Sequence, residues 1–350
     1  MASLAAWMPD AQTVLADLSY LPPPSLDEFY IGLQSWKGMP FRWRNAGAAE
    51  GGKFFFSGTY WSRATAEHWE IPLVAVAAYV VMIPLLKRFV AQHGKFNVRS
   101  FAFYWNAMLS LFSWCGVAAC VPVLVTSLWE HGLHFTTCAP AAWYATGWSG
   151  FFVALFIYSK IAELVDTVLL LLAGKPVIAL QWWHHSTVLL YCWHSYSVRI
   201  ATGAWFACMN YSVHSIMYGY FAVMGTKHRR AVAPYAIYIT LLQLVQMLVG
   251  MFVTIKAVQH QAEGEECHVN KTNSILGLAM YASYFVLFFK LFVDNYYLRP
   301  RGQKRRPTVR EVARSMSRKI TQNVGVEAEG SDEGASTEVA LEEPALKKLN

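Results

Sequence analysis

Charged residues are scarce in this sequence. Asp, Glu, Lys and Arg make up 15% of its 350 residues, whereas a soluble domain carries about 25%. Hydrophobic residues make up 55%, so too little polar surface is available to cover a globule in water. The composition therefore excludes an ordinary soluble protein and favours an integral membrane protein. In that setting the formal net charge of +7 is expected to report membrane orientation and not nucleic-acid binding.

Two further patterns are absent. None of the six cysteines forms a CxxC pair, which argues against a cysteine-based zinc site, and four of them lie in apolar runs where they pack as small hydrophobic residues. The first residues, MASLAAWMPDAQ, contain neither a basic n-region nor a long apolar h-region. We therefore expect no cleavable signal peptide, and the first membrane span must direct insertion.

Long apolar segments are what the sequence does contain. A transmembrane helix needs about 20 mostly apolar residues, and nothing in residues 1–70 meets this requirement. Seven later segments do, although polar residues interrupt the third, fourth and fifth of them. The seven expected spans are residues 71–91, 103–127, 148–172, 177–196, 200–224, 232–258 and 274–296.

The placement of Lys and Arg between these spans predicts their orientation. Basic residues follow spans one, three, five and seven, whereas the loops after spans two, four and six have few of them or are dominated by Glu. This alternation fits seven spans with a cytosolic C-terminus. We expect residues 1–70 to form a lumenal segment, residues 71–297 the seven-helix domain, and residues 298–350 a cytosolic, disordered tail.

Polar residues inside the third to sixth spans mark a functional site, because ionisable groups in a membrane are costly. Counted from the nearest cytosolic loop, they share a layer roughly 10–20 Å into the membrane. Several follow i, i+3, i+4 spacing and so share a helix face. A buried polar site open to the cytosol is therefore predicted. Its candidates are Lys160, Glu163, Asp166, Thr167, Gln181, His184, His185, His194, Asn210, Tyr211, His214, Tyr218, Thr240, Gln243 and Gln246.

These residues also have structural interpretations. His194, Gln243 and Gln246 could simply hydrogen-bond neighbouring helices. Lys160 and Glu163 could form an intrahelical ion pair. A di-iron centre is poorly supported, because only four of the 11 histidines lie in expected spans. A zinc ion held by the two adjacent histidines of span four and the histidine of span five remains a lesser alternative, since zinc needs about three or four ligands.

Four patterns occur in order along the chain. KxxExxDT covers residues 160–167, and HxxHH covers residues 181–185 with Gln181 in the first place. NxxxHxxMYxYY covers residues 210–221 with Phe221 in the last place, and TxxQxxQ covers residues 240–246. Over residues 96–297 the chain thereby resembles the ELO family of very-long-chain fatty acid elongases, in pattern closest to the branch that acts on saturated and monounsaturated chains. The Gln181 departure leaves the role of that position open.

The resemblance implies both a fold and an activity. The fold is an all-α integral membrane protein of seven transmembrane helices, six of which ring a closed tunnel for the acyl chain. The activity is that of an acyltransferase, a 3-oxoacyl-CoA synthase, which converts acyl-CoA and malonyl-CoA to 3-oxoacyl-CoA, CoA and CO2. No cofactor and no metal are implied. The expected partners are the two CoA substrates, membrane lipid and other enzymes of the elongation cycle. A homo- or hetero-oligomer is compatible with this scheme, and nucleic acid is not an expected partner.

The roles within this scheme are hypotheses. His184 attacks the thioester and holds the chain as an acyl-imidazole. His185 orients it or carries a proton, and a carboxylate of span three fixes the tautomer. His214, helped by Asn210, activates malonyl-CoA or stabilises the developing negative charge. The other assigned residues are Asp166, Glu163, Lys160 and Gln181 for catalysis and Tyr218, Gln243, Gln246, Lys175, Lys227, Arg229, Arg230 and Lys290 for substrate binding. The basic ones are expected to meet CoA phosphates, unless they only set orientation.

A second class of function stays open. A seven-helix transporter or receptor could use the same buried charges for ligand or proton passage. It is disfavoured because the polar layer lies near one mouth and does not continue toward the lumen.

Three features outside the spans carry their own predictions. Lys347 and Lys348 stand fourth and third from the end, the dilysine pattern of retrieval to the endoplasmic reticulum, a receptor-read address like other C-terminal signals. Cys138 and Cys267 lie in loops expected to be lumenal, an oxidising space, so we expect them to pair. The sequon at Asn270 lies in the same loop and is a candidate glycosylation acceptor.

Overall fold

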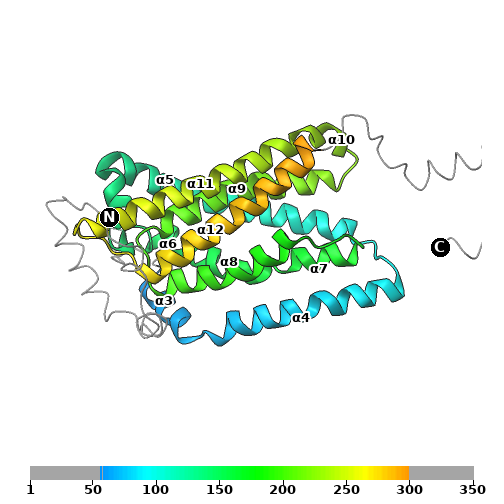
Figure 1. Cartoon of the computed structure of the whole chain (residues 1–350), viewed down its shortest axis with the longest axis horizontal. Coiled ribbons are helices and arrows are strands. Elements are labelled where there is room, and N and C mark those ends of the chain that lie inside the picture. The colour runs from blue at the N-terminus through cyan, green and yellow to red at the C-terminus, as the bar shows by residue number, and fades with distance from the viewer. Residues whose placement is uncertain (1–55, 57, 299–350) are drawn as a thin grey trace, which may run out of the picture. The chain divides into compact units, whose positions relative to one another are not determined.

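The computed structural model describes residues 56 and 58–298, and the statements below refer to these residues. The chain divides into two units, Met1–Tyr297 and Leu298–Asn350, so all but one of the described residues belong to the first unit. This part of the chain contains helices and no strand (Figure 1), which confirms the expected all-α class. The predicted tail beyond residue 298, with Lys347 and Lys348, lies outside the described residues.

The helices follow the expected spans. One expected span each lies on α4, α5, α8 and α9, the third falls on the consecutive helices α6 and α7, and the last two fall on α11 and on α12 with its π-helical extension. A further helix, α3, precedes the spans. The elements are α3 (Gly58–Glu67), α4 (Glu70–His93), α5 (Arg99–Cys138), η2 (Ala141–Trp143), α6 (Gly147–Ala162), α7 (Val165–Leu172), α8 (Ala179–Ser197), α9 (Gly203–Met224), α10 (Arg229–Val232), η3 (Ala233–Tyr235), α11 (Ala236–Ala262), α12 (Lys271–Phe292) and η4 (Val293–Tyr297).

Four of these stretches are long and apolar enough to cross a membrane: Glu70–His93, Arg99–Cys138, Arg229–Ala262 and Lys271–Tyr297. Only 6% of the most apolar stretch of α4 is buried. Its exposed Leu and Val side chains have no protein partner to cover them, so lipid is the solvent that suits them. These helices support an integral membrane protein. The other expected spans are interrupted by the polar residues of α8 and α9 and by the break between α6 and α7.

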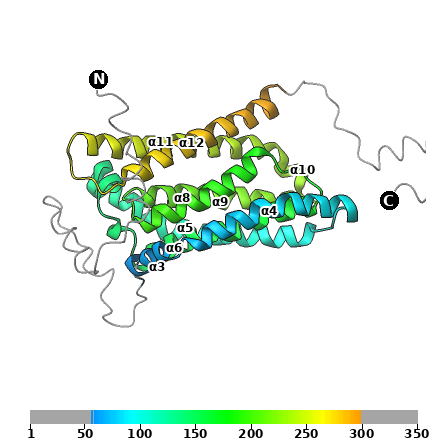
Figure 2. The same cartoon turned by 60° about the horizontal axis from the view of Figure 1, so that its bottom comes forward.

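The helices pack in a closed cycle of neighbours (Figures 1 and 2). α6 contacts α5, α5 contacts α9, α9 contacts α11, α11 contacts α12, α12 contacts α8, and α8 contacts α6 again. α4 packs against α7 and α8 on the outside of this cycle. Side chains that point inward from α6, α8 and α9 are therefore shielded by protein on every side.

The loops separate into two groups at opposite ends of the helices. At one end Phe96 N donates to Leu172 O at 2.8 Å and Arg99 Nε donates to Gly225 O at 2.6 Å, which joins the α4–α5 loop to the ends of α7 and α9. At the other end His268 N donates to Cys138 O at 2.8 Å. We call these the basic end and the cap end, because the expected cytosolic Lys and Arg residues lie in the loops of the first group.

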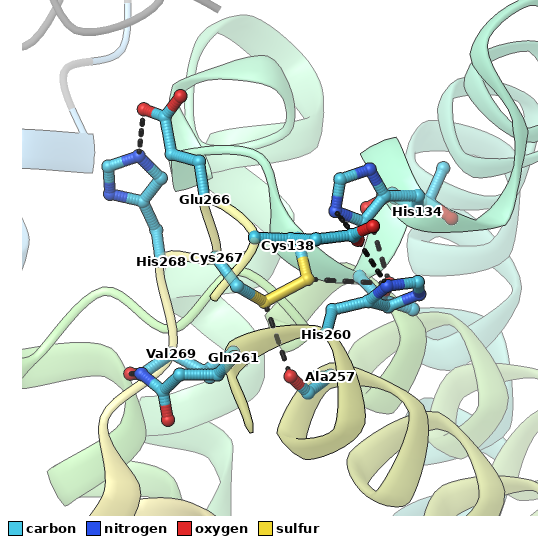
Figure 3. Close-up of a disulfide and its surroundings, with 12 residues drawn as sticks. His134, Cys138, Ala257, His260, Gln261, Glu266, Cys267, His268 and Val269 are labelled. Atoms are coloured by element: carbon cyan, nitrogen blue, oxygen red, sulfur yellow. Dashed lines mark hydrogen bonds and ion pairs between the residues drawn. A yellow bond between two sulfur atoms is a disulfide. The ribbon is translucent and has the colours of Figure 1, made fainter. Parts of the chain in front are cut away.

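A disulfide fastens the cap end. Cys138, the last residue of α5, is bonded to Cys267 in the α11–α12 loop (Figure 3). This is the pair expected from the sequence. Ala201 N also donates to His268 O at 3.1 Å, so the α8–α9 loop is hydrogen-bonded to the α11–α12 loop as well.

Candidate functional site

A buried ionic cluster joins the end of α6 to the middle of α9. Lys160 Nζ donates to Glu163 Oε1 at 2.6 Å and to Asn210 Oδ1 at 3.1 Å. The Lys160 and Glu163 side chains are only 1% and 4% exposed. Asn210 Nδ2 lies 3.1 Å from His214 Nε2, and His214 Nδ1 lies 3.9 Å from Glu163 Oε1. Each buried charge therefore has a partner of opposite sign or a hydrogen bond, as a low-dielectric site requires.

This cluster defines the tautomer of His214. A lysine ammonium group can only donate, so the amide oxygen of Asn210 faces Lys160 and its amide nitrogen faces His214. Because that nitrogen donates, Nε2 of His214 is the acceptor. A neutral His214 then carries its proton on Nδ1, directed toward Glu163. The imidazole can present this N–H to a group that develops negative charge.

A second line of hydrogen bonds positions His185. Gln181 Nε2 lies 2.9 Å from His185 Nε2 and 3.3 Å from Thr167 Oγ1, whose hydroxyl is 2.8 Å from Tyr79 OH. The side-chain amide of Gln181 thus bridges the His185 ring and the Thr167 hydroxyl. Gln181, the departure from the histidine box, thus contacts the box histidine directly and can position it.

His184 lies between these two lines of contacts. Its ring stands perpendicular to that of His185 with centroids 5.3 Å apart, and 4.8 Å from the ring of Tyr284. His184 is half-buried, whereas His185 and His214 are 6% and 9% exposed. Of the three, His184 is the imidazole most open to a substrate.

Asp166 has partners other than histidine. Trp105 Nε1 donates to Oδ1 at 2.7 Å and Tyr218 OH donates to Oδ2 at 2.7 Å. The sequence suggested that Asp166 or Glu163 fixes the tautomer of His184. In the described residues the hydrogen bonds of Asp166 go to Trp105 and Tyr218, and the carboxylate of Glu163 faces Lys160 and His214. Tyr218, expected to bind substrate, also packs its ring 5.2 Å from that of His214.

The glutamines of α11 lie apart from this network. Gln243 Nε2 contacts Met217 Sδ at 3.2 Å, and Gln246 is buried. Thr240 Oγ1 donates to Ala236 O, one turn earlier in its own helix. Hydrogen bonds among the described residues thus tie Gln243 to α9 without joining it to a histidine.

The basic residues expected to meet CoA lie at the basic end. Lys290 is exposed on α12 and pairs with Asp294 at 2.7 Å. The hydrogen bond from Arg99 to Gly225 O places a further cation beside the α9–α11 loop, which the sequence analysis did not assign to the site. The exposed loop residues of this group are Lys175, Lys227, Arg229 and Arg230.

On the side of the cluster nearer the cap end, the helices enclose a small cavity of about 30 Å³. Phe156 forms part of its wall, and the centroid of the Phe156 ring lies 4.2 Å from Lys160 Nζ. Tyr144 borders it from the loop before α6 and donates to Ile200 O. Burial raises the pKa of Tyr144 well above its ordinary value, so its hydroxyl stays neutral. The lining residues are Tyr144, Val153, Phe156, Ile157, Tyr191, Cys192, Ser195, Tyr196, Ile200, Gly203 and Phe206.

Three residues of the site were missed by the sequence analysis. Tyr79, Trp105 and Tyr284 supply hydrogen bonds or ring contacts to the candidate residues from α4, α5 and α12. A search for hydroxyl-bearing or N–H-bearing aromatic residues in the apolar spans would have selected them among others, because buried Tyr and Trp side chains need a polar partner.

Comparisons with known proteins identify the family of the chain. The sequence profile of the ELO: GNS1/SUR4 family matches residues 64–305. The chain is 39% identical over 280 residues to fatty acid elongase 3 of Trypanosoma brucei brucei, covering 73% of this chain and 92% of that protein. It is 46% identical over 217 residues to fatty acid elongase 1 of the same organism, covering 61% and 70%. Over 244 residues it is 36% identical to very long chain fatty acid elongase 6 of Drosophila melanogaster, covering 69% and 76%.

Proposed function

Because the chain belongs to the GNS1/SUR4 (ELO) family and functions in fatty acid elongation in a membrane, we propose that it catalyses the condensation step. Acyl-CoA and malonyl-CoA are its substrates in this proposal, and 3-oxoacyl-CoA, CoA and CO2 are its products. The branch that acts on saturated and monounsaturated chains is proposed from the sequence motifs. A panel of acyl-CoA substrates, read by product mass, tests that part.

The observation that most supports this proposal is the convergence of three helices on one set of polar side chains. His184 and His185 lie side by side on α8, and His214 of α9 faces the Lys160–Glu163 pair of α6. A neutral imidazole is a competent nucleophile toward a thioester. Phe156, whose ring contacts Lys160, also lines the small cavity toward the cap end, and we propose that the acyl chain extends in this direction.

In the proposed first step, a ring nitrogen of His184 attacks the thioester carbonyl carbon. A carbon–nitrogen bond forms, the carbon–sulfur bond breaks, and the imidazole proton leaves with the CoA thiolate. In the second step malonyl-CoA loses CO2, and its enolate carbon attacks the acyl-imidazole. The carbon–nitrogen bond breaks, and the imidazole takes up one proton from solvent. The Nδ1–H of His214 donates to the enolate oxygen as it forms.

We also propose seven membrane spans, six of which ring a tunnel that is closed at the cap end. The closed cycle of helix contacts and the sorting of loops into two ends support it. The basic end would then face the cytosol, as would the C-terminus. Residence in the endoplasmic reticulum is part of this proposal, and replacing Lys347 and Lys348 by Ser without any change in location would contradict that assignment.

The acyl-imidazole is tested with purified protein and acyl-CoA alone. Free CoA should appear before any malonyl-CoA is added, and the steady-state kinetics should be ping-pong. Mass spectrometry should find the acyl group on His184. His184→Ala should abolish early CoA release, whereas His214→Ala should retain part of it and lose condensation.

A matched control comes from the same helix. His194 lies on α8 toward the cap end, where Asn273 holds it at 2.8 Å. His194→Gln should keep early CoA release if the protein stays folded. Intact early release in His184→Ala, or an adduct on another residue, would refute the assignment to His184. A single displacement with both substrates bound would give no early release in any variant.

The transporter or receptor alternative is not favoured. The relatives described above are all named as fatty acid elongases. Microsomes that carry the protein should release labelled CO2 from malonyl-CoA in step with a two-carbon-longer product, which a transporter would not do.

A further inference from the structure

A second cluster of ionisable side chains lies at the cap end, away from the proposed catalytic histidines. It consists of His134 from the last part of α5, His260 from the last turn of α11, and Glu265 from the loop that follows. Figure 3 shows His134 and His260 beside the Cys138–Cys267 disulfide. Their ring centroids are 4.3 Å apart.

Two backbone features bring these residues together. Gly132, at φ 80° and ψ 179°, interrupts α5 in a conformation that essentially only glycine adopts. It redirects the segment that carries His134. α11 ends at Ala262, Gly264 follows with φ 79°, and Glu265 N donates to His260 O at 3.0 Å. This closed turn at the helix end folds Glu265 back over His260.

The three side chains present their ligand atoms to one point. His134 Nε2 lies 3.3 Å and His260 Nδ1 lies 2.6 Å from Glu265 Oε2, and the three ligand atoms all lie within 4.8 Å of one another. Two ligands of a tetrahedral zinc ion lie roughly 3.3 Å apart, given its bond lengths of about 2.0–2.2 Å. The first distance already fits. The second requires a shift of the Glu265 side chain, which is 48% exposed and free to move toward solvent.

We propose that His134, His260 and Glu265 bind one Zn²⁺ ion, with water in the fourth position. Two imidazoles and a carboxylate form a ligand set that zinc accepts. Zinc has a filled d shell and no geometric preference from its d electrons, so these three ligands and water can surround it tetrahedrally. The ion would link the end of α5 to the α11–α12 loop, as the neighbouring disulfide does. Its role is to hold the cap end closed, and it takes no part in the proposed condensation.

The experiment uses the full chain in detergent under non-reducing conditions, with a purification tag that contains no histidine. After treatment with a chelator, zinc binding is measured by competition with a chromophoric chelator. The wild type should bind one high-affinity ion per chain, and zinc should raise its Tm. His134→Ala and His260→Ala should each weaken binding by more than about tenfold and remove the zinc-dependent rise in Tm.

His268→Ala is the matched control. It lies in the same loop, pairs with Glu266 at 3.3 Å, and is not one of the three ligands, so it should bind zinc like the wild type. If His260→Ala fails to fold, His260→Asn replaces it, with elution as a single species on size exclusion as the criterion. The proposal would be overturned if the wild type showed no high-affinity zinc binding, or if the His134 and His260 variants bound zinc as tightly as the wild type. It would also be overturned if His268→Ala lost as much affinity as those two variants.

Discussion

Lys160 is a buried cation that two neighbouring side chains hold in place. It is fully enclosed, and its ammonium group is neutralised by Glu163 and hydrogen-bonded by Asn210. A buried pair of this kind is a weak source of stability by itself, because desolvation offsets the attraction between the charges. Its value here is that it orients Asn210 and, through it, His214.

Replacing Lys160 alone should therefore be more harmful than replacing both charges. Lys160→Met leaves Glu163 buried and unpaired, which should lower the free energy of unfolding by about 3–5 kcal/mol. The double variant Lys160→Met/Glu163→Gln should recover much of this loss. Thermal unfolding in detergent micelles measures both. Equal destabilisation of the single and double variants would show that packing, and not the lone charge, causes the loss.

Gln181 gives a separate prediction about positioning. Its amide donates to His185 Nε2 and Thr167 Oγ1. Gln181→Ala removes both hydrogen bonds, and loss of the one to His185, worth about 0.5–1.5 kcal/mol, should lower kcat by up to about tenfold. The KM for acyl-CoA should not change, since Gln181 holds a histidine and not the substrate. Gln181→His should restore most of kcat; a variant no better than Ala would contradict the positioning role.

Among the elements, α6 and α7 show where sequence reasoning succeeds and where it stops. The apolar run of residues 148–172 predicted a helical span, and helices occupy it. The i, i+3, i+7 spacing placed Lys160, Glu163 and Thr167 on one face. Instead, backbone bonds from Asp166 N to Glu163 O and from Thr167 N to Leu164 O tighten the chain between the two helices. Thr167 turns toward Gln181, while Lys160 and Glu163 face α9.

The sequence could not reveal this break, because no Pro or Gly marks it. The partners of Asp166 were unpredictable for a related reason. Trp105 and Tyr218 come from α5 and α9, and depth along a span fixes the level of a side chain but not the direction in which it points. Residue types and their layer were therefore predictable, whereas the individual pairings depended on how the helices rotate and pack.

The disulfide joins two elements and should stabilise their contact. Replacing Cys138 and Cys267 together by Ser removes a link between residues 129 apart in the sequence, and should lower the free energy of unfolding by about 2–5 kcal/mol. Cys115→Ser, at an exposed free cysteine, is the control and should have little effect. Without reduction, alkylation of the denatured protein should modify the four free cysteines; modification of all six would show that the pair is not bonded.

Across the whole molecule, charge and polarity are distributed along the helix direction. Most exposed cations of the described residues lie at the basic end, the imidazoles and the Lys160–Glu163 pair lie inside the bundle, the small cavity follows, and the disulfide closes the cap end. This order suits a substrate with a polyanionic head and an apolar tail. It places the thioester, which joins head to tail, at the level of the histidines.

The final prediction concerns the head group of that substrate. If Lys227, Arg229 and Arg230 attract the phosphates of CoA, reversing all three to Glu should raise the KM for acyl-CoA. Added salt should narrow the difference in KM between the variant and the wild type, because salt screens exposed charges. Lys271→Glu, at the cap end, should leave KM unchanged. Protease mapping of the α9–α11 loop should give the same orientation in the triple variant and the wild type. Unchanged kinetics in the triple variant would show that these cations only set the orientation of the protein in the membrane.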